Sequence, residues 1–213
     1  MKKIMFNDKY RLTQAVLDGS KTMTRRIVPQ CILDAAKKYQ EEYYAGALEH
    51  ISLKDAIMNM VGPERMFDNH VYKVGEIVAI AQNYDVARLD MSEQQLEDLT
   101  YADMKHLFYH KKKMPGFTNK MFVRAEWMPH HIRITGFKVE YLQDISDEDC
   151  LREGVRADLL CVQYSFPSNI GYCGQYPFST PRDAFAALID KVGKRGTWDS
   201  NPLVFAYECI RED

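Results

Sequence analysis

The sequence predicts a single α+β domain in which a mixed β-sheet or barrel carries helices packed around it. Short apolar runs typical of strands, such as Ile77-Val78-Ala79-Ile80 and Leu203-Val204-Phe205, lie far apart in the chain. Segments with helical spacing of apolar residues separate them, so the strands must pair at long range. The 213 residues contain no internal repeat and no change of composition that would mark a second domain. We therefore expect one domain over residues 1–213.

The first elements lead into a basic segment. An apolar run at 3–6 predicts a strand, and Asn7 is placed to cap a helix that continues to Asp18. Gly19 follows this helix at the position where a left-handed backbone is common, so we expect a positive φ there. The β-prone run at 21–28 predicts the next strand.

Helical segments dominate the middle of the chain. Apolar residues recur with helical spacing three times, at 32–44, 52–60 and 92–110. Ser52 and Ser92 stand at the starts of the last two helices, as capping residues. A strand is expected at 75–82, after a turn glycine. We interpret the regions near 31–66 and 92–110 as helical insertions in the domain.

The C-terminal part alternates strands, helices and one long connection. Strands are expected at 122–127, 132–142 and 202–210, and helices at 146–153 and 181–192. Gly154 ends the first of these helices, and Pro181 favours the first turn of the second. The region near 156–180 is rich in Tyr, Ser, Gly and Pro, which predicts a long surface loop.

Composition excludes several classes of function. The net charge is only −2, which argues against bulk binding of nucleic-acid phosphates and leaves a local basic patch as the alternative. No stretch approaches the roughly 18 apolar residues of a membrane span. The five cysteines form no CxxC pair and indicate reduced thiols in a cytoplasmic protein.

His106 and His110 have metal-ligand spacing without an evident third ligand, so we expect neither metal nor cofactor. The oligomeric state stays open.

The segment Leu17-Asp18-Gly19-Ser20-Lys21-Thr22-Met23-Thr24-Arg25-Arg26 is the most informative in the chain. A helix that ends on glycine, followed by Lys, Thr and Arg, gathers cations and hydroxyls at one junction. These groups suit phosphate, carboxylate or carbonyl oxygens of a ligand. The alternative is a solvated basic strand on the protein surface.

This segment resembles the opening signature of ASCH domains, in which a helix, a Gly-x-Lys-Thr turn and a Thr-x-Arg strand follow one another. Three further stretches agree in order and spacing. These are Val74-Gly75-Glu76-Ile77-Val78, the strand-to-helix junction at 137–146 with Glu153-Gly154-Val155, and Phe185-Ala186-Ala187-Leu188-Ile189 with 196–204. The last resembles the branch common in phage and prophage proteins. The resemblance spans nearly the whole chain.

The resemblance implies a β-barrel related to PUA domains and the binding of RNA or a modified nucleoside. We expect the ligand in a cleft lined by the Gly19–Arg26 segment and Glu153. Its implied ligand-binding residues are Gly19, Ser20, Thr22, Arg25, Arg26 and Tyr84. A smaller bacterial branch, similar at Lys21, Thr24 and Glu153, removes the acyl group from N4-acetylcytidine. For this branch the resemblance implies Thr24 as nucleophile, Lys21 as its base and Glu153 as an orienting or proton-relaying acid.

Spacing sets a condition on this chemistry. Residues three apart on an extended strand point to opposite faces, so Lys21 and Thr24 cooperate only if Lys21 lies in the turn after Gly19 or a bulge intervenes. Three classes of function stay open. They are a binding module for RNA or a nucleoside, an amidohydrolase acting on N4-acylated cytidine, and a non-catalytic protein-interaction factor.

Overall fold

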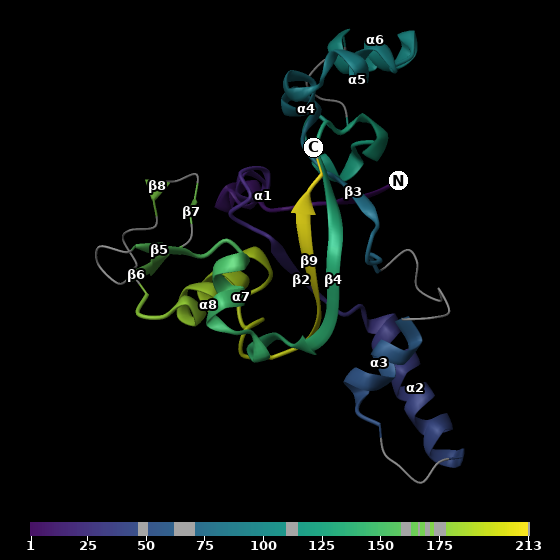
Figure 1. Cartoon of the computed structure of the whole chain (residues 1–213), viewed down its shortest axis with the longest axis vertical. Helices are drawn as coiled ribbons and strands as arrows, with labels where there is room; N and C mark the ends of the chain where they lie inside the picture. The colour runs from purple at the N-terminus through teal and green to yellow at the C-terminus, as the bar shows by residue number, and fades with distance from the viewer. Residues whose placement is uncertain are drawn as a thin grey trace.

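A five-stranded sheet forms the centre of the protein (Figure 1). The structure is a computed structural model that describes residues 1–46, 51–61, 71–109, 115–158, 163–165, 167–168, 171–172 and 178–212. The strands of the central sheet are β1 (Lys2–Ile4), β2 (Met23–Ile27), β3 (Ile77–Ile80), β4 (His131–Tyr141) and β9 (Leu203–Arg211). Their order is β1-β3-β4-β9-β2, so the sheet joins elements from both ends of the sequence.

The sheet is mixed, as the sequence predicts. Strand β1 pairs with β3 in parallel, and the other three pairings are antiparallel. The long β4 and β9 strands run side by side through the middle of the sheet (Figure 1). Their register shifts between Ile134 and Gly136, which marks a bulge and bends the pair.

The expected barrel does not close, because the sheet is open among the described residues. Strands β1 and β2 are its two edges, and no backbone ladder joins them. Strand β1 has only three residues, and Asn7 then caps the 3-10 helix η1 (Asp8–Tyr10), which ends the extended chain early. A side chain spans the gap instead: Arg26 Nη2 donates to the Met5 carbonyl at 2.6 Å.

Helices surround the sheet on three sides (Figure 1). Beside it lie α1 (Leu12–Leu17), the packed pair α2 (Gln30–Gly46) and α3 (Leu53–Val61), then α4 (Tyr84–Asp90), α5 (Glu93–Glu97) and α6 (Tyr101–Tyr109), and finally α7 (Asp147–Arg152) and α8 (Pro181–Val192). The 3-10 helices η2 (Lys120–Phe122) and η3 (Ala125–Trp127) lie between α6 and β4 in the chain, and η4 (Leu142–Asp144) lies between β4 and α7. No helix of the described residues has the length and apolar character needed to cross a membrane.

Two predictions near α6 were wrong. The helix expected at 92–110 is two helices, because Thr100 begins α6 as a second cap that accepts from the Asp103 backbone amide. The strand expected at 122–127 is absent, and η2 and η3 occupy that region. Lys3 Nζ donates to the carbonyls of Met121 and Val123, which removes both from any strand ladder. Helix α4 was not predicted.

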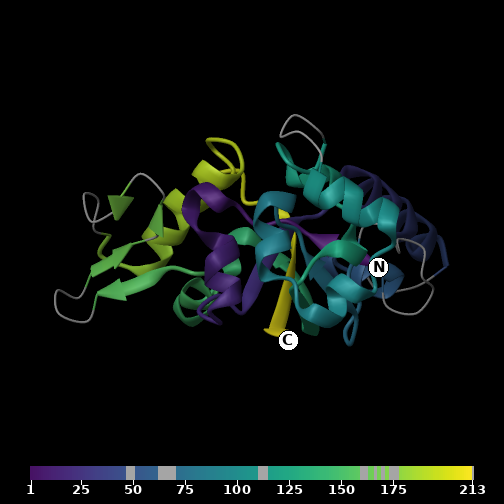
Figure 2. The same cartoon turned by 90° about the horizontal axis from the view of Figure 1, so that it is seen from above.

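The predicted loop near 156–180 contains short strands where the structure describes it. They form the antiparallel pairs β5 (Arg156–Asp158) with β6 (Gln163–Ser165) and β7 (Pro167–Ser168) with β8 (Gly171–Tyr172). Seen from above, these pairs lie at the opposite end of the molecule from α5 and α6 (Figure 2). The rest of the predicted loop lies outside the described residues.

Buried apolar side chains hold the helices to the sheet. The largest group lies between the sheet and α1, α2 and α3, and includes Leu12, Val16, Ile32, Ile57, Ile80, Ile132 and Phe205. A separate group under α4 and α6 contains Tyr84, Leu107, Phe117 and Trp127. A third packs α7 and α8 together through Cys150, Ala184 and Phe185. This third group places α8 and the end of α7 beside the start of β2.

Candidate functional site

The turn after α1 brings Lys21 to the start of β2. Gly19 has φ +75°, which confirms the expected left-handed exit from the helix. The Lys21 backbone amide donates to the Ala15 carbonyl at 2.8 Å, so this residue still belongs to the turn. The strand begins two residues later, at Met23. The condition that spacing placed on Lys21 and Thr24 is therefore met.

Lys21 makes a buried ion pair with Glu153. Its Nζ lies 2.5 Å from Glu153 Oε2 and donates to the Glu153 carbonyl at 2.8 Å. Glu153 is the C-cap of α7, and Gly154 follows it with φ +99°. The Lys21 side chain is only 3% exposed, and this burial lowers the pKa of its ammonium, although Glu153 acts in the opposite direction. The Lys21 ammonium therefore gives up its proton more readily than that of a solvated lysine, which makes the neutral amine more accessible as a base.

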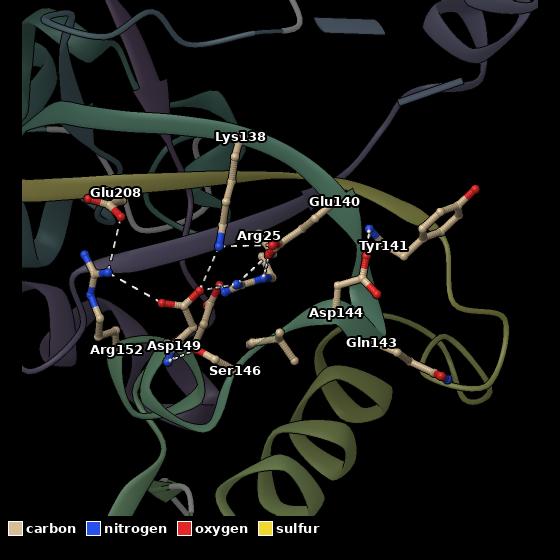
Figure 3. Close-up of polar contacts among 12 residues, drawn as sticks. Arg25, Lys138, Glu140, Tyr141, Gln143, Asp144, Ser146, Asp149, Arg152 and Glu208 are labelled. Atoms are coloured by element: carbon tan, nitrogen blue, oxygen red, sulfur yellow. Dashed lines mark hydrogen bonds and ion pairs between the residues drawn. The ribbon is translucent and has the colours of Figure 1, made fainter. Parts of the chain in front are cut away.

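Arg25 lies at the centre of a cluster of carboxylates (Figure 3). Its Nε donates to Glu140 at 2.8 Å, Nη1 to Glu153 at 3.1 Å and Nη2 to Asp149 at 2.9 Å. The guanidinium side chain is 1% exposed. Because Arg25 holds one oxygen of Glu153 and Lys21 holds the other, the two cations fix this carboxylate from both sides.

Further cations surround the cluster. Lys138 Nζ lies 3.0 Å from both Glu140 and Asp149, and Arg152 reaches Asp149 and Glu208 (Figure 3). Burial raises the pKa of the Asp149 carboxyl, but hydrogen bonds from Lys138 and Arg25 lower it more, so that its net shift is downward. The Asp149 carboxylate thus stays charged at neutral pH, and the ion pairs of the network join β2, β4 and α7.

A cavity of about 370 Å³ opens beside the Lys21–Glu153 pair. One part of its lining is polar and the other is apolar. Lys21, Thr24, Arg25, Arg26, Lys120, Glu153, Asn7 and Asp8 supply the polar part, and Met5, Phe6, Leu12, Phe185, Leu188, Ile189 and Val192 the apolar part. A concave apolar wall with a few convergent polar groups is typical of small-molecule sites. We call this hollow the first cavity.

Thr24 presents an uncommitted hydroxyl to the first cavity. The residue is 4% exposed, and its hydroxyl makes no hydrogen bond to any described residue. In particular it does not bond to Lys21, whose Nζ is engaged by Glu153. Contacts between catalytic groups are often longer without a bound ligand, so this geometry is compatible with both a binding and a catalytic role.

Arg26 is the cation of the first cavity that lacks a carboxylate partner in the described chain. Lys21 pairs with Glu153, Arg25 with three carboxylates and Lys120 with Asp8 at 2.7 Å. Arg26 instead donates to the Met5 carbonyl and lies 5.7 Å from the centroid of the Phe6 ring. Its remaining donors suit an anionic or carbonyl group of a ligand.

The structure gathers five of the predicted site residues and separates four. Lys21, Thr24, Arg25, Arg26 and Glu153 line the first cavity, whereas Gly19, Ser20, Thr22 and Tyr84 do not. Tyr84 is the first residue of α4 and is 2% exposed. The centroid of its ring lies 5.2 Å from that of Phe117 and 5.3 Å from that of Trp127. Its hydroxyl accepts from the Arg124 backbone amide. Tyr84 is therefore a core residue of the α4–α6 region.

Sequence reasoning missed several groups of the site. The carboxylates Glu140 and Asp149, the ring of Phe6 and the apolar face of α8 carried no individual signal. Pairing of β2 with β9 and of β9 with β4 brings Glu140 close to Arg25. The alternation of apolar and charged residues at 137–141 places Glu140 on the same side as Lys138, as on a solvent-facing side, so the sequence carried no signal of its burial.

Other predicted candidates lie elsewhere. No group of three or more potential metal ligands occurs within the described ranges, and the His106 ring packs 5.7 Å from Tyr84. His110 lies outside the described residues.

Comparisons of the chain with protein-family models, with curated proteins and with solved structures find no match. The ASCH resemblance therefore stays a prediction. What the chain does must be argued from the first cavity and the ion-pair cluster beside it.

Proposed function

We propose that the chain binds a nucleoside-like ligand, either within RNA or as a free modified nucleoside, in the first cavity. The observation that carries the proposal is the meeting of an apolar wall with Lys21, Thr24 and Arg26 in a hollow of about 370 Å³. This volume lies within the roughly 300–1,000 Å³ of typical ligand pockets. A nucleoside has the same division, with flat base faces and a polar base edge and sugar.

Each part of the first cavity has a counterpart on such a ligand. The side chains of Leu188 and Ile189 offer an apolar surface to a base face. The Thr24 hydroxyl donates to or accepts from a base edge, and Arg26 binds a carbonyl or phosphate oxygen. The open sheet whose edges are joined through Arg26 and Met5 is, in this proposal, a variant of the PUA-like ASCH barrel.

Isothermal titration with cytidine, N4-acetylcytidine and cytidine 5′-monophosphate tests the proposal. Thr24→Val keeps the side-chain shape and removes one hydrogen bond, so nucleoside affinity should fall about threefold to tenfold. Thr135→Val is the matched control, because Thr135 is an exposed strand threonine that does not line the cavity. If the three ligands fail to bind, or if both variants behave alike, the proposal is wrong.

Hydrolysis of an acyl amide on the bound nucleoside is the second candidate. The observation that favours it is an uncommitted Thr24 hydroxyl in the same cavity as a lysine whose pKa burial lowers. Lys21 would first pass a proton to Glu153, 2.5 Å away, and then take the hydroxyl proton as Thr24 Oγ1 attacks the acyl carbonyl. The amine leaves with that proton, and water releases the acid from the Thr24 ester.

Acetate release from N4-acetylcytidine tests this reaction. Thr24→Val should abolish turnover while the fold remains intact, and Thr24→Ser should retain part of it because the nucleophilic oxygen stays. Lys21→Arg should be nearly as damaging as Lys21→Met, because an arginine cannot give up its proton at neutral pH. Turnover that survives Lys21→Arg would show that Lys21 is not the base, and a wild-type chain that binds N4-acetylcytidine without cleaving it leaves binding as the function.

A further inference from the structure

A second cavity of about 220 Å³ adjoins the first. It is lined by Asp8, Arg11, Thr13, Gln14, Leu17, Gln82, Asn83 and Val86. Asp8 lines both cavities, and its carboxylate accepts from Thr13 at 2.5 Å and from Lys120 at 2.7 Å. This bonded group of Asp8, Thr13 and Lys120 therefore lies where the two cavities meet.

Two neighbouring amides of the second cavity are not satisfied by the described chain. Gln82 is 5% exposed, and its Oε1 has no hydrogen-bond partner there. Its Nε2 lies 3.4 Å from Asp90 Oδ2. Because a carboxylate only accepts hydrogen bonds, the nitrogen of the amide must face Asp90, and the oxygen is the atom without a partner. Asn83 holds the N-cap position of α4 but makes no capping bond. Buried polar groups are nearly always paired, so the Gln82 oxygen indicates that a bound molecule supplies its missing partner.

Arg11 adds a positive charge to the same cavity. It separates η1 from α1 with φ +52°, a left-handed conformation that costs energy in a residue with a side chain. No ion pair to Arg11 occurs in the described chain. Residues held in such conformations cluster at ligand sites.

We infer that the second cavity receives the base of a nucleotide adjacent to the one in the first cavity, so the ligand is RNA with at least two residues. Side-chain amides pair a donor and an acceptor with a base edge, and single-stranded RNA exposes such edges. Arg11 suits a phosphate of the same strand. A volume of about 220 Å³ is small for a whole ligand and sufficient for one base. The inference rests on the proposed nucleoside site.

Titration of cytidine, its 5′- and 3′-monophosphates, and the dinucleotides CpU and UpC measures the contribution of the second base. At least one dinucleotide should bind about tenfold more tightly than the corresponding monophosphate, as expected for one amide–base pair. Gln82→Met should remove this gain and leave the affinity for cytidine unchanged. Asparagine tolerates a φ of +52°, so Arg11→Asn should keep the backbone conformation. Because it removes the charge that faces a phosphate, it should weaken the binding of both monophosphates and dinucleotides. Arg195→Asn, at an exposed arginine that lines neither cavity, is the control.

The outcomes separate the two proposals. Binding of cytidine with no gain from a second base, or a gain that survives Gln82→Met, overturns the inference and leaves the first cavity as a nucleoside site. Failure of every ligand to bind overturns both. A gain that Gln82→Met removes and Arg195→Asn retains supports the second base site.

Discussion

Replacing Arg25 with methionine should destabilise the protein more than any single change at its surface. Within the described residues, Arg25 is the one cation that contacts Glu140, Asp149 and Glu153 together, through three separate donors. Methionine fills much of the same space but leaves the three carboxylates with Lys21, Lys138 and Arg152. Removing one partner from a buried ion pair costs about 3–5 kcal/mol, because a charge stays buried without compensation.

This loss is a large part of a total stability of about 5–15 kcal/mol. Lys138 is about half exposed and already neutralises part of Glu140 and Asp149, so we expect a value near the lower end, about 3 kcal/mol. The stability of Arg25→Lys should fall between that of Arg25→Met and that of the wild type, because a lysine keeps the charge but cannot reach the three carboxylates with the fixed fork of a guanidinium. Partial recovery should follow when Asp149→Asn is added to Arg25→Met, since fewer unpaired carboxylates remain.

Urea unfolding followed by circular dichroism measures these free energies, provided that the slope with denaturant is unchanged between variants. Arg195→Met is the control, and an exposed position of this kind should change stability by no more than about 0.5 kcal/mol. A cost below about 1 kcal/mol for Arg25→Met would show that the cluster is solvated or neutral, and the reasoning about a charged buried network would fail.

Three further predictions follow from the same structure. The pKa of the Asp149 carboxyl is lowered in the folded state, so its contribution to stability is complete above the unfolded pKa of 3.8 and is lost as pH falls below that value. The free energy of unfolding, measured in urea from pH 6 to 3, should therefore decrease, and Asp149→Asn should reduce this decrease. Gly19→Ala should lower the free energy of unfolding by about 1–2 kcal/mol because of its positive φ alone, since an added Cβ meets nothing within 4 Å. Gly116→Ala should cost more in urea unfolding, because its Cβ would lie 2.2 Å from the Tyr84 ring. The logarithm of the affinity for single-stranded RNA should fall with the logarithm of the salt concentration with a slope of only about −1.4, from about −0.7 for each of Arg11 and Arg26. A slope steeper than about −4 would require a basic surface outside both cavities.

Local sequence signals predicted most of the elements near the site. The glycine turn at Gly19, the Ser146 cap of α7 and the Pro181 start of α8 are each determined by residues close in sequence. The apolar runs of β3 and β9 likewise needed only their own composition. Elements that depend on such short-range chemistry can be predicted from one sequence.

Contacts between distant segments were beyond such reasoning. The 122–127 strand failed because Lys3, more than a hundred residues earlier, binds the carbonyls that a ladder would use. The carboxylates around Arg25 come from β4 and α7, and only the strand order β4-β9-β2 brings them together. Tyr84 looked like an available ring because its helix α4 and the rings that cover it were not foreseen.

The most direct test of the account is a crystal structure of the chain with N4-acetylcytidine bound. We predict the base against Leu188 and Ile189, with Thr24 and Lys21 next to the acetyl group and Arg26 bonded to a ligand oxygen. The Arg25 cluster should be unchanged, because its donors are already bound to protein carboxylates. A ligand bound elsewhere on the chain, with the first cavity filled by solvent alone, would contradict the account.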